Sequence, residues 1–425
     1  MRTSLLRTAV AFCTSSLALL AQAPPGYYAS VDTSSATRLR NTLHAVIDDH
    51  QRLPYTASTL DTWDVLESAQ VDPNSASRIL DVYRNQSFRT VTDRVSGYNR
   101  EHVWPKSYGF PNDGADNYAY TDCHALWLCD ASYNSSRSNL PFDACSSGCA
   151  EYPTLSNNGM GGGSGTHPGQ SNWRSGSAGA FGTWEVWAGR KGDLARAIFY
   201  MDIRYEGGTH GGTGISEPDL IVTDDRSLIA NGQSTSNRSV AYMGVLSTLL
   251  AWHRADPPDA FEQRRNDVVF GAQGNRNPFV DHPEWIDYLF GGVVPGAFTT
   301  YGTGCATGAG VIPGISYSGS LSIGRNLTML CSGAPSLQPA LLNFDITASS
   351  LPLSPFGLGS CTLLARPGLV VGASTNLFGT ATAAMAVPND LQMVGFQLFS
   401  QWVVLDPAGA GAATTQGAEL RFGRG

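Results

Sequence analysis

Lysine is nearly absent from this chain of 425 residues, in which Lys106 and Lys191 are the two lysines among 27 basic residues. With 35 acidic residues, the formal net charge is -8. An acidic chain is a poor candidate for tight, salt-driven nucleic-acid binding over its whole surface, although it can still carry a local basic cleft. The arginine bias suits bidentate contacts to phosphate, and a genome of high GC content would produce the same bias.

Charge of either sign is scarce after about Val293, where histidine and lysine are missing altogether. The charged residues of this tail are Arg325, Asp345, Arg366, Asp390, Asp406, Glu419, Arg421 and Arg424. Because so few side chains there can exchange protons or bind metal, we do not expect catalysis in the tail. A chain of this length exceeds one ordinary core. We therefore predict two folded units, residues 24–292 and 293–425.

No apolar run after residue 23 is long enough to cross a bilayer. The first 23 residues contain Arg2 and Arg7, an apolar run over residues 9–20, and the small-residue sequence Ala21-Gln22-Ala23. This order is typical of a secretory signal peptide. We predict that residues 1–23 are a signal peptide and that the mature chain is secreted or periplasmic, has no membrane span and is a monomer.

Seven cysteines follow the predicted signal peptide. Four cluster in the first unit and three are spread through the tail, namely Cys123, Cys129, Cys145 and Cys149, then Cys305, Cys331 and Cys361. In an exported chain we expect the first four to form two disulfides and one tail cysteine to stay free or to pair outside the chain. Zinc binding by the first four is the alternative, disfavoured because the spacing lacks paired C-x2-C motifs.

Hydrophobic periodicity and turn residues predict the coarse secondary structure. Helices are expected after a cap at Ser34 or Ser35, and over residues 58–69, 192–205, 240–252 and 259–269. A strand is expected over residues 78–84 and a long loop over residues 146–182. The tail alternates short Val, Leu, Ile and Thr runs with Gly, Pro and Ser, which predicts a β-sandwich.

The stretch from Asn99 to Lys106 reads N-R-E-H-V-W-P-K and sets Glu101 directly before His102. Neighbours on a regular strand point to opposite faces, so a joint task requires a bent backbone. A neutral histidine can take a proton from water, and a carboxylate prefers a hard cation such as Mg²⁺. The alternative is a histidine bonded to backbone beside a solvated glutamate, which an isolated pair would favour.

A second segment, residues 122–142, adds compatible chemistry. It begins as a strand, offers Asp130 as a helix N-cap, and places Asn134 and Arg137 on one helical face. The order strand, loop, strand, helix would let an amide oxygen complete a metal site begun by Glu101, while the guanidinium reaches the same phosphate. Asparagine near a helix start also has an ordinary capping explanation.

These two motifs resemble the endonuclease I family of secreted and periplasmic bacterial nucleases, which belongs to the ββα-metal, or His-Me finger, group. The similarity continues in K-G-D-L-A-R-A-I-F-Y-M-D at 191–202 and Q-G-N-R-N-P-F-V-D-H-P-E at 273–284, and spans about residues 41–290. It implies an α+β fold in which a ββα-metal finger is embedded in a mixed helical domain, followed here by the all-β tail.

The resemblance implies site roles as well. It puts the general base on His102, metal ligands on Glu101 and Asn134, and a phosphate-binding role on Arg137. The implied cofactor is Mg²⁺, with Mn²⁺ or Ca²⁺ as substitutes. The implied reaction is hydrolysis of DNA, with RNA as a further candidate, leaving 5′-phosphate and 3′-hydroxyl ends. Little sequence preference is expected because phosphate contacts carry no base information.

Other roles stay open at this stage. Asp122 and His124 are candidates for orienting a site water or phosphate, with ordinary packing as the equal alternative. The tail is similar to glycine-rich carboxy-terminal domains of exported bacterial proteins and is expected to bind a surface or a sorting partner. The alternative for the whole chain is an adhesion or binding protein built on an inactive nuclease scaffold.

Overall fold

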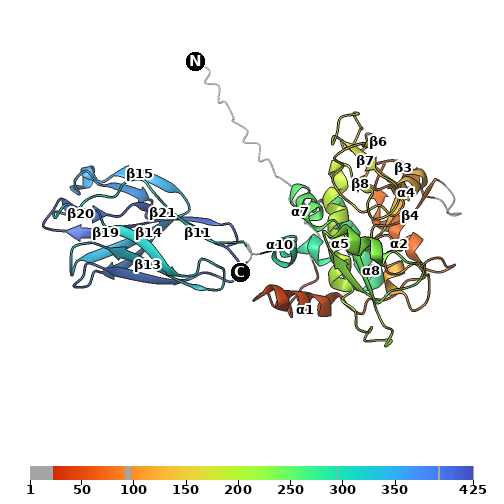
Figure 1. Cartoon of the computed structure of the whole chain (residues 1–425), viewed down its shortest axis with the longest axis horizontal. Helices are drawn as coiled ribbons and strands as arrows, with labels where there is room; N and C mark the ends of the chain where they lie inside the picture. The colour runs from red at the N-terminus through yellow and green to blue at the C-terminus, as the bar shows by residue number, and fades with distance from the viewer. Residues whose placement is uncertain (1–22, 91–96, 293, 391–392, 425) are drawn as a thin grey trace, which may run out of the picture.

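The computed structural model describes residues 23–90, 97–292, 294–390 and 393–424. Figure 1 shows a region of helices and short strands that ends with α10 (Glu284–Phe290), and an all-β region that begins with β11 (Ala297–Tyr301). The predicted α+β class is confirmed. The predicted signal peptide lies almost entirely outside the described residues.

The first helix, α1 (Ala36–Ile47), confirms the prediction from its capping residue and its apolar spacing. The Ser35 hydroxyl accepts a hydrogen bond from the backbone N–H of Arg38. Leu39, Leu43 and Ile47 recur at helical spacing and are fully buried.

The second helix, α2 (Thr62–Ala69), begins four residues later than predicted. Its N-cap is Asp61, whose carboxylate accepts from the N–H groups of Trp63 and Asp64. The Asp64 carboxylate in turn accepts from the Asp61 N–H, which completes a capping box. This reciprocal cap fixes the helix start at a point that apolar spacing alone does not mark.

The strand predicted over residues 78–84 is wrong in its second half. A three-stranded antiparallel sheet is made by β1 (Val71–Asp72), β2 (Ser75–Leu80) and β3 (Ser87–Arg89). Pairing stops after Leu80 because the Asp81 carboxylate accepts from the N–H groups of Tyr83, Arg84 and Gln86. A turn held by an aspartate side chain replaces the strand.

The two motifs fold into a strand, loop, strand, helix unit, called the finger below. Strand β4 (Tyr98–His102) pairs antiparallel with β5 (Leu126–Asp130), the loop between them contains α3 (Tyr118–Thr121), and α4 (Ala131–Arg137) follows. Asp130 caps α4 by accepting from the N–H groups of Ser132 and Tyr133. The predicted cap and element order are confirmed.

The central helix, α5 (Lys191–Arg204), follows a short 3-10 turn, η1 (Ala188–Arg190). The apolar residues Leu194, Ala197, Ile198 and Met201 predict one buried face, but every residue from Gly192 to Arg204 is buried. Its cations are neutralised inside the protein, since Arg196 pairs with Glu262 at 2.5 Å and Arg204 pairs with Glu217 at 2.8 Å. These ion pairs let a helix with charged residues on several faces occupy the centre of the region.

The helix predicted over residues 240–252 is wrong in its first part. Residues Val240–Met243 form β10, which pairs parallel with β9 (Asp219–Val222), and α7 (Leu246–Ala255) starts afterwards. A short apolar run does not distinguish strand from helix, and here the tertiary pairing decides. The remaining helices of this region are α6 (Arg226–Gly232), α8 (Ala260–Gln273) and α9 (Pro278–Asp281).

The predicted loop over residues 146–182 contains strands. The antiparallel sheet consists of β6 (Ala150–Pro153), β7 (Ser171–Ser175) and β8 (Thr183–Glu185). The stretch between β6 and β7 remains irregular and rich in glycine.

The cysteine prediction is half right. Cys145 and Cys149 form a disulfide, whereas Cys123 and Cys129 are free and buried among apolar side chains in and beside β5. In the tail Cys305 pairs with Cys361, and Cys331 is free as expected. The alternative of zinc held by the first four cysteines is wrong, because two of them are joined as a disulfide.

The tail is built from antiparallel sheets. The largest sheet has the order β11-β21-β19-β14-β17, with β20 also paired to β19. Its other strands are β14 (Pro339–Asp345), β17 (Leu369–Ser374), β19 (Gln397–Asp406), β20 (Gly411–Thr414) and β21 (Gly417–Arg421). The smaller elements are β12 (Gly314–Gly319), β13 (Asn326–Ser332), β18 (Ala381–Ala386), the pair β15 (Ala348–Pro352) and β16 (Thr362–Ala365), and η2 (Ser354–Phe356).

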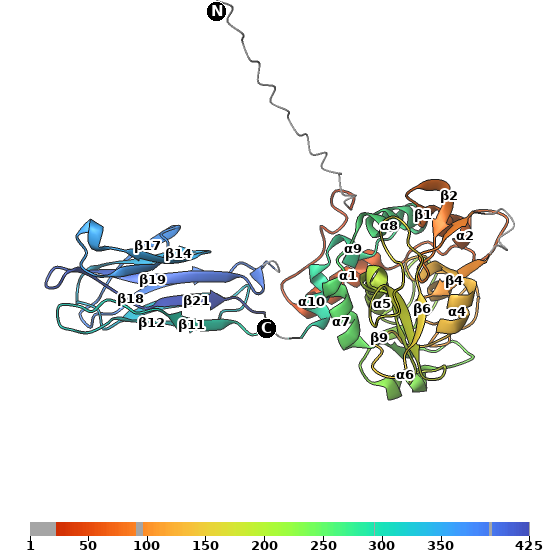
Figure 2. The same cartoon turned by 90° about the horizontal axis from the view of Figure 1, so that it is seen from above.

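Two of these sheets share one core. Leu327 and Met329 come from the sheet of β12, β13 and β18, and they pack in the same buried cluster as Leu342, Trp402 and Leu420 from the large sheet. The layered strands are visible in Figure 2. The structure therefore has the sandwich-like tail that was predicted.

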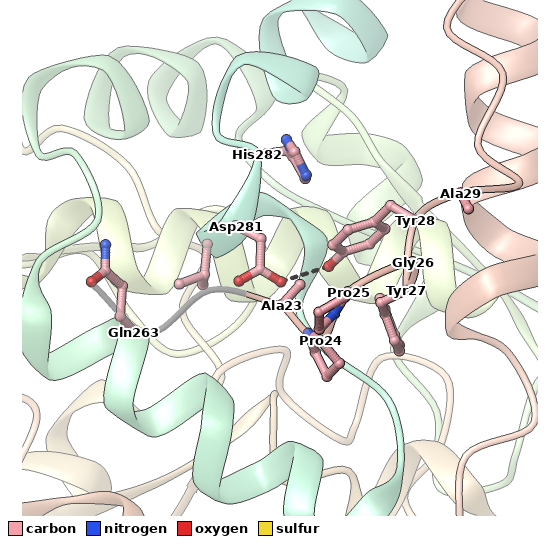
Figure 3. Close-up of a pocket in the computed structure, with 11 residues that line it drawn as sticks. Ala23, Pro24, Pro25, Gly26, Tyr27, Tyr28, Ala29, Gln263, Asp281 and His282 are labelled. Carbon is pink, nitrogen blue, oxygen red and sulfur yellow. Dashed lines mark hydrogen bonds between the residues drawn. The ribbon is translucent and has the colours of Figure 1, made fainter. Parts of the chain in front are cut away.

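The chain enters the helical region along α9. Figure 3 shows a pocket there that is lined by residues 23–29, Gln263, Val280, Asp281 and His282. The Tyr28 hydroxyl donates to Asp281 at 2.6 Å. No part of the finger lines this pocket, so it is separate from the site described next.

Candidate active site

Strand β4 stays regular through the neighbouring pair. Glu101 lies opposite Trp127 and His102 opposite Leu126 in an uninterrupted antiparallel register. Alternation therefore places Asn99 and Glu101 on one face of β4, and Arg100 and His102 on the other. The bend that a joint task would require does not occur within the strand, and the two side chains have separate contacts.

The Glu101 carboxylate is 2 % exposed and is held by two groups on one oxygen. Its Oε1 accepts from the Tyr83 hydroxyl at 2.8 Å and lies 2.8 Å from Arg137 Nη1. Burial raises the pKa of Glu101, while Arg137 and the Tyr83 hydroxyl oppose that rise. Among the described residues no donor is bonded to Oε2, so that oxygen is available to a cation.

Asn134 lies half-buried on α4 above the same face of β4. Its amide nitrogen donates to Asn99 Oδ1 at 2.7 Å and to the Arg100 carbonyl at 3.2 Å. Both amide hydrogens are thereby used, which leaves the amide oxygen as a free acceptor or ligand. The structure thus brings Asn134 and Glu101 to one side of β4.

Arg137 is buried and ties α4 to the end of β4. Its two terminal nitrogens donate to the backbone carbonyls of His102 and Val103 at 2.9 and 2.7 Å. The guanidinium also lies over the Phe142 ring, 4.6 Å from its centroid. With a side chain that is 1 % exposed, Arg137 holds Glu101 and the strand end in place, and its implied phosphate contact remains a prediction.

The His102 ring packs on the other face of β4. Its Nε2 lies 3.0 Å from the Tyr120 carbonyl, which can only accept, so Nε2 carries the hydrogen and Nδ1 is unprotonated. The ring stacks on Tyr55 with 5.9 Å between centroids and meets Tyr120 edge-on at 4.8 Å. Burial above all, with a smaller contribution from the Lys106 charge, lowers the pKa of His102 to about 3, although the hydrogen bond to the Tyr120 carbonyl raises it in part. The imidazole is therefore neutral near pH 7 and can accept a proton.

The predicted residues form two groups. Glu101, Asn134 and Arg137 meet between β4 and α4, whereas His102 meets Tyr55 and Tyr120. Within the ranges that the structure describes, no hydrogen bond joins the His102 ring to the side chain of Glu101 or Asn134.

Asp122 and His124 lie in a buried polar network beside α5. The Asp122 carboxylate accepts from the Tyr200 and Tyr205 hydroxyls at 2.8 and 3.0 Å, and from the Gln273 amide at 3.1 Å. His124 Nε2 lies 3.0 Å from the Asn275 carbonyl. These are packing contacts of the kind expected from the alternative for His124, and a role of Asp122 or His124 in orienting a site water or phosphate remains a prediction.

Three residues that shape the site were not predicted from the sequence. Tyr83 binds Glu101, Asn99 orients Asn134, and the carbonyl of Tyr120 sets the His102 tautomer. Asn99 lies in the first motif. Strand alternation places it on the same face as Glu101, so its role could have been predicted. Tyr83 and Tyr120 lie outside both motifs, and nothing in their sequence surroundings marks them.

The donor atoms fit a hard cation. In the described part of the chain no three His, Cys, Asp or Glu side chains gather as a metal site. One carboxylate oxygen and one amide oxygen, completed by water, make a different kind of site, since asparagine is not among those residue types. Oxygen ligands of this kind suit Mg²⁺, Mn²⁺ or Ca²⁺.

Comparison with known proteins agrees with this chemistry. A model of the family described as Endonuclease I matches residues 35–284. The extracellular ribonuclease of Bacillus amyloliquefaciens is 36% identical over 267 residues, which cover 62% of this chain and 78% of that protein. The extracellular ribonuclease of Bacillus subtilis (strain 168) is 34% identical with the same coverage.

These matches define the chain as a hydrolase of the nuclease class. It belongs to the endonuclease I family. The family match ends before the all-β region. None of the described helices combines the length and hydrophobicity needed to span a bilayer.

Proposed function

We propose that this chain is an exported, metal-dependent endonuclease that hydrolyses DNA and RNA with little sequence preference. The observation that carries the proposal is a pair of oxygens on one side of β4, Glu101 Oε2 and Asn134 Oδ1, to which no described residue donates a hydrogen bond. The two ribonuclease relatives support RNA as a substrate, and their description as extracellular supports export. The two disulfides are consistent with an oxidising compartment.

Glu101 and Asn134 would hold the divalent ion, with Mg²⁺ as the natural choice and Mn²⁺ or Ca²⁺ as substitutes. When bound, such an ion supplies positive charge that offsets the negative charge developing on the phosphate. Asn99 keeps the Asn134 amide oxygen turned outwards, and Arg137 keeps the buried Glu101 in place. The resemblance also gives Arg137 a phosphate contact, which we retain as part of the proposal.

His102 acts as the general base. Its Nδ1 accepts a proton from the attacking water as the water oxygen bonds to phosphorus and the bond from phosphorus to the 3′ oxygen breaks. The departing 3′ oxygen takes a proton from solvent, so the products carry 5′-phosphate and 3′-hydroxyl ends. The Tyr120 carbonyl supports this role, because it keeps the hydrogen on Nε2 and the lone pair on Nδ1.

The test compares His102→Ala with wild type on supercoiled plasmid and on end-labelled RNA, in Mg²⁺ with and without EDTA. General-base catalysis contributes about 10² to 10⁴ in rate, and the variant should lose that much while still binding Mn²⁺ in calorimetry. His282→Ala, which removes a half-exposed histidine paired with Glu284 at 3.1 Å, is the matched control. Absence of EDTA-sensitive cleavage of both substrates by wild type would refute the proposal in favour of a binding protein on an inactive scaffold.

We further propose that residues 24–292 form the nuclease domain and that residues 293–425 form a separate domain that binds a surface or a sorting partner. The scarcity of charged and proton-exchanging side chains in the tail supports this division. Cleavage by a variant truncated after Gly292 tests this division.

A further inference from the structure

Lys106 lies four residues after His102 in the turn that follows β4. The Lys106 carbonyl accepts from the Phe110 N–H at 3.0 Å, and Tyr108 N–H donates to the Pro105 carbonyl at 2.8 Å. The Trp104 indole closes the same turn by donating to the Tyr108 carbonyl at 2.7 Å. The backbone that carries Lys106 is therefore fixed relative to the end of β4.

The Lys106 ammonium is tied to the aromatic group that packs on His102. Its Nζ donates to the Tyr120 hydroxyl at 2.7 Å and lies 4.7 Å from the Tyr120 ring centroid. The same ring meets the His102 imidazole, and the Tyr120 carbonyl fixes its tautomer. Tyr120 thus places a positive charge next to the proposed base.

No carboxylate of the described residues balances this charge. Most other buried or half-buried cations near the core have one, as Lys191 has Glu185 at 2.7 Å and Arg137 has Glu101 at 2.8 Å. For Lys106, no ion pair is found with any described residue, and one of its three N–H groups is bonded, to a neutral hydroxyl. The side chain is half-buried, so two donors and a full charge remain for a ligand that arrives from solvent.

We propose that Lys106 binds a backbone phosphate of the nucleic-acid substrate next to the phosphate that is cleaved. A lysine ammonium contacts phosphate as a point charge, without reading bases, which suits a nuclease of little sequence preference. Because the turn and Tyr120 fix its position relative to His102, this contact sets the register of the strand over the base. The inference rests on the proposed function.

The experiment measures binding of fluorescein-labelled oligonucleotides, single-stranded RNA and duplex DNA, by anisotropy in EDTA over a range of KCl concentrations. Each phosphate contact contributes about 0.7 (single strand) to 0.9 (duplex) to the slope of log K against log salt. Lys106→Met should reduce the magnitude of the slope by about that amount and raise KM in Mg²⁺ by a larger factor than it changes kcat. Lys106→Arg should keep the wild-type slope because it keeps the charge.

Two further variants separate charge from structure. Tyr120→Phe removes the hydroxyl that anchors Lys106 but leaves its charge, so affinity should fall while the salt slope stays at the wild-type value. Arg254→Gln removes an exposed charge on α7 that is paired with Asp287 of α10. Figures 1 and 2 place α7 away from β4 and α4, so this variant should change neither quantity.

The outcomes are distinguishable from failure of the proposed function. An unchanged slope in a folded Lys106→Met, judged by its thermal midpoint, would overturn the Lys106 contact while EDTA-sensitive cleavage still stood. If Lys106→Met does not fold, Lys106→Gln replaces it, and an unchanged slope there is equally decisive. A wild-type protein that cleaves neither substrate would remove the proposed function and this inference together.

Discussion

The helical region and the all-β region differ in what they bury. The helical region encloses ion pairs such as Arg196 with Glu262 and Arg137 with Glu101. In the described residues of the all-β region the ion pair found is Arg421 with Glu419, 3.5 Å apart at the surface, and the core is apolar. Buried ion pairs add little net stability but are intolerant of losing one partner. The helical region therefore holds charged groups in fixed positions with little net gain in stability. A catalytic site requires such fixed charges.

The largest expected difference between the regions follows from removing a buried cation. Arg137→Met should lower the free energy of unfolding by about 3 to 5 kcal/mol, because Glu101 would stay buried without its counter-charge. Urea unfolding monitored by fluorescence, or thermal unfolding monitored by calorimetry, measures this loss of stability. The double variant Arg137→Met/Glu101→Met should recover part of it, since neither charge is then left alone.

The matched change in the all-β region is Arg421→Gln. An exposed pair contributes about 0 to 1 kcal/mol, so its loss should be small. Equal losses of unfolding free energy from the two substitutions would show that burial of the Arg137 pair has no special consequence. The proposed difference between the two regions would then be wrong.

Each region has one disulfide, and their loops differ in length. Cys305 and Cys361 are 56 residues apart, whereas Cys145 and Cys149 are 4 apart. Loop-closure entropy gives about 4 kcal/mol for the longer loop and about 2 kcal/mol for the shorter. Replacing both cysteines of each pair by alanine and scanning each variant by calorimetry should show the greater loss in the all-β region. A greater loss at Cys145 and Cys149 would indicate strain or local packing instead of chain entropy.

Much of the fold could be predicted from local signals. Ser35, Asp130 and Asp259 cap helices as their residue types indicate, and apolar spacing locates α1. The misses occur where a distant contact decides. Residues 240–243 become a strand because β9 lies alongside, and α5 is buried all round because its cations have partners far along the chain.

The candidate site was predicted only in part, because some of its contacts also join residues that are distant in the sequence. The spacing of Asn134 and Arg137 predicted one helical face on α4, and both side chains contact β4, Arg137 at Glu101 and Asn134 at Asn99. Their roles in the site remain predictions. The sequence did not reveal that Arg137 is buried against backbone carbonyls, or that His102 is held by Tyr120, because both contacts depend on how the loop between β4 and β5 returns.

A smaller expected difference between the two regions lies in how their stability depends on pH. Burial lowers the pKa of His50 to about 3, and the histidine-free tail has no such group. Unfolded His50 titrates near pH 6.5, so the folded state binds fewer protons below that pH. The stability that His50 provides is complete above about pH 6.5 and falls as pH drops toward 3, at about 1.4 kcal/mol per pH unit.

The measurement compares wild type with His50→Gln by urea unfolding at pH 7, 6 and 5. Wild type should be more stable at pH 7, where His50 Nδ1 accepts from Arg204 Nε at 3.0 Å. That advantage should shrink at each lower pH because the variant lacks the titrating group. A constant difference would mean that His50 keeps an ordinary pKa in the folded protein.

The smallest expected effect comes from removing the all-β region altogether. A variant that ends at Gly292 loses the bond from Arg424 Nε to the Gly292 carbonyl and the Arg424 contact with Tyr288, both remote from the finger. Changes away from a site alter its energetics by about 0.5 kcal/mol or less, so kcat and KM on plasmid and RNA should stay within about twofold of wild type. A well-folded truncated protein with strongly reduced cleavage would show that the tail takes part in substrate binding, although it has so few side chains suited to that chemistry.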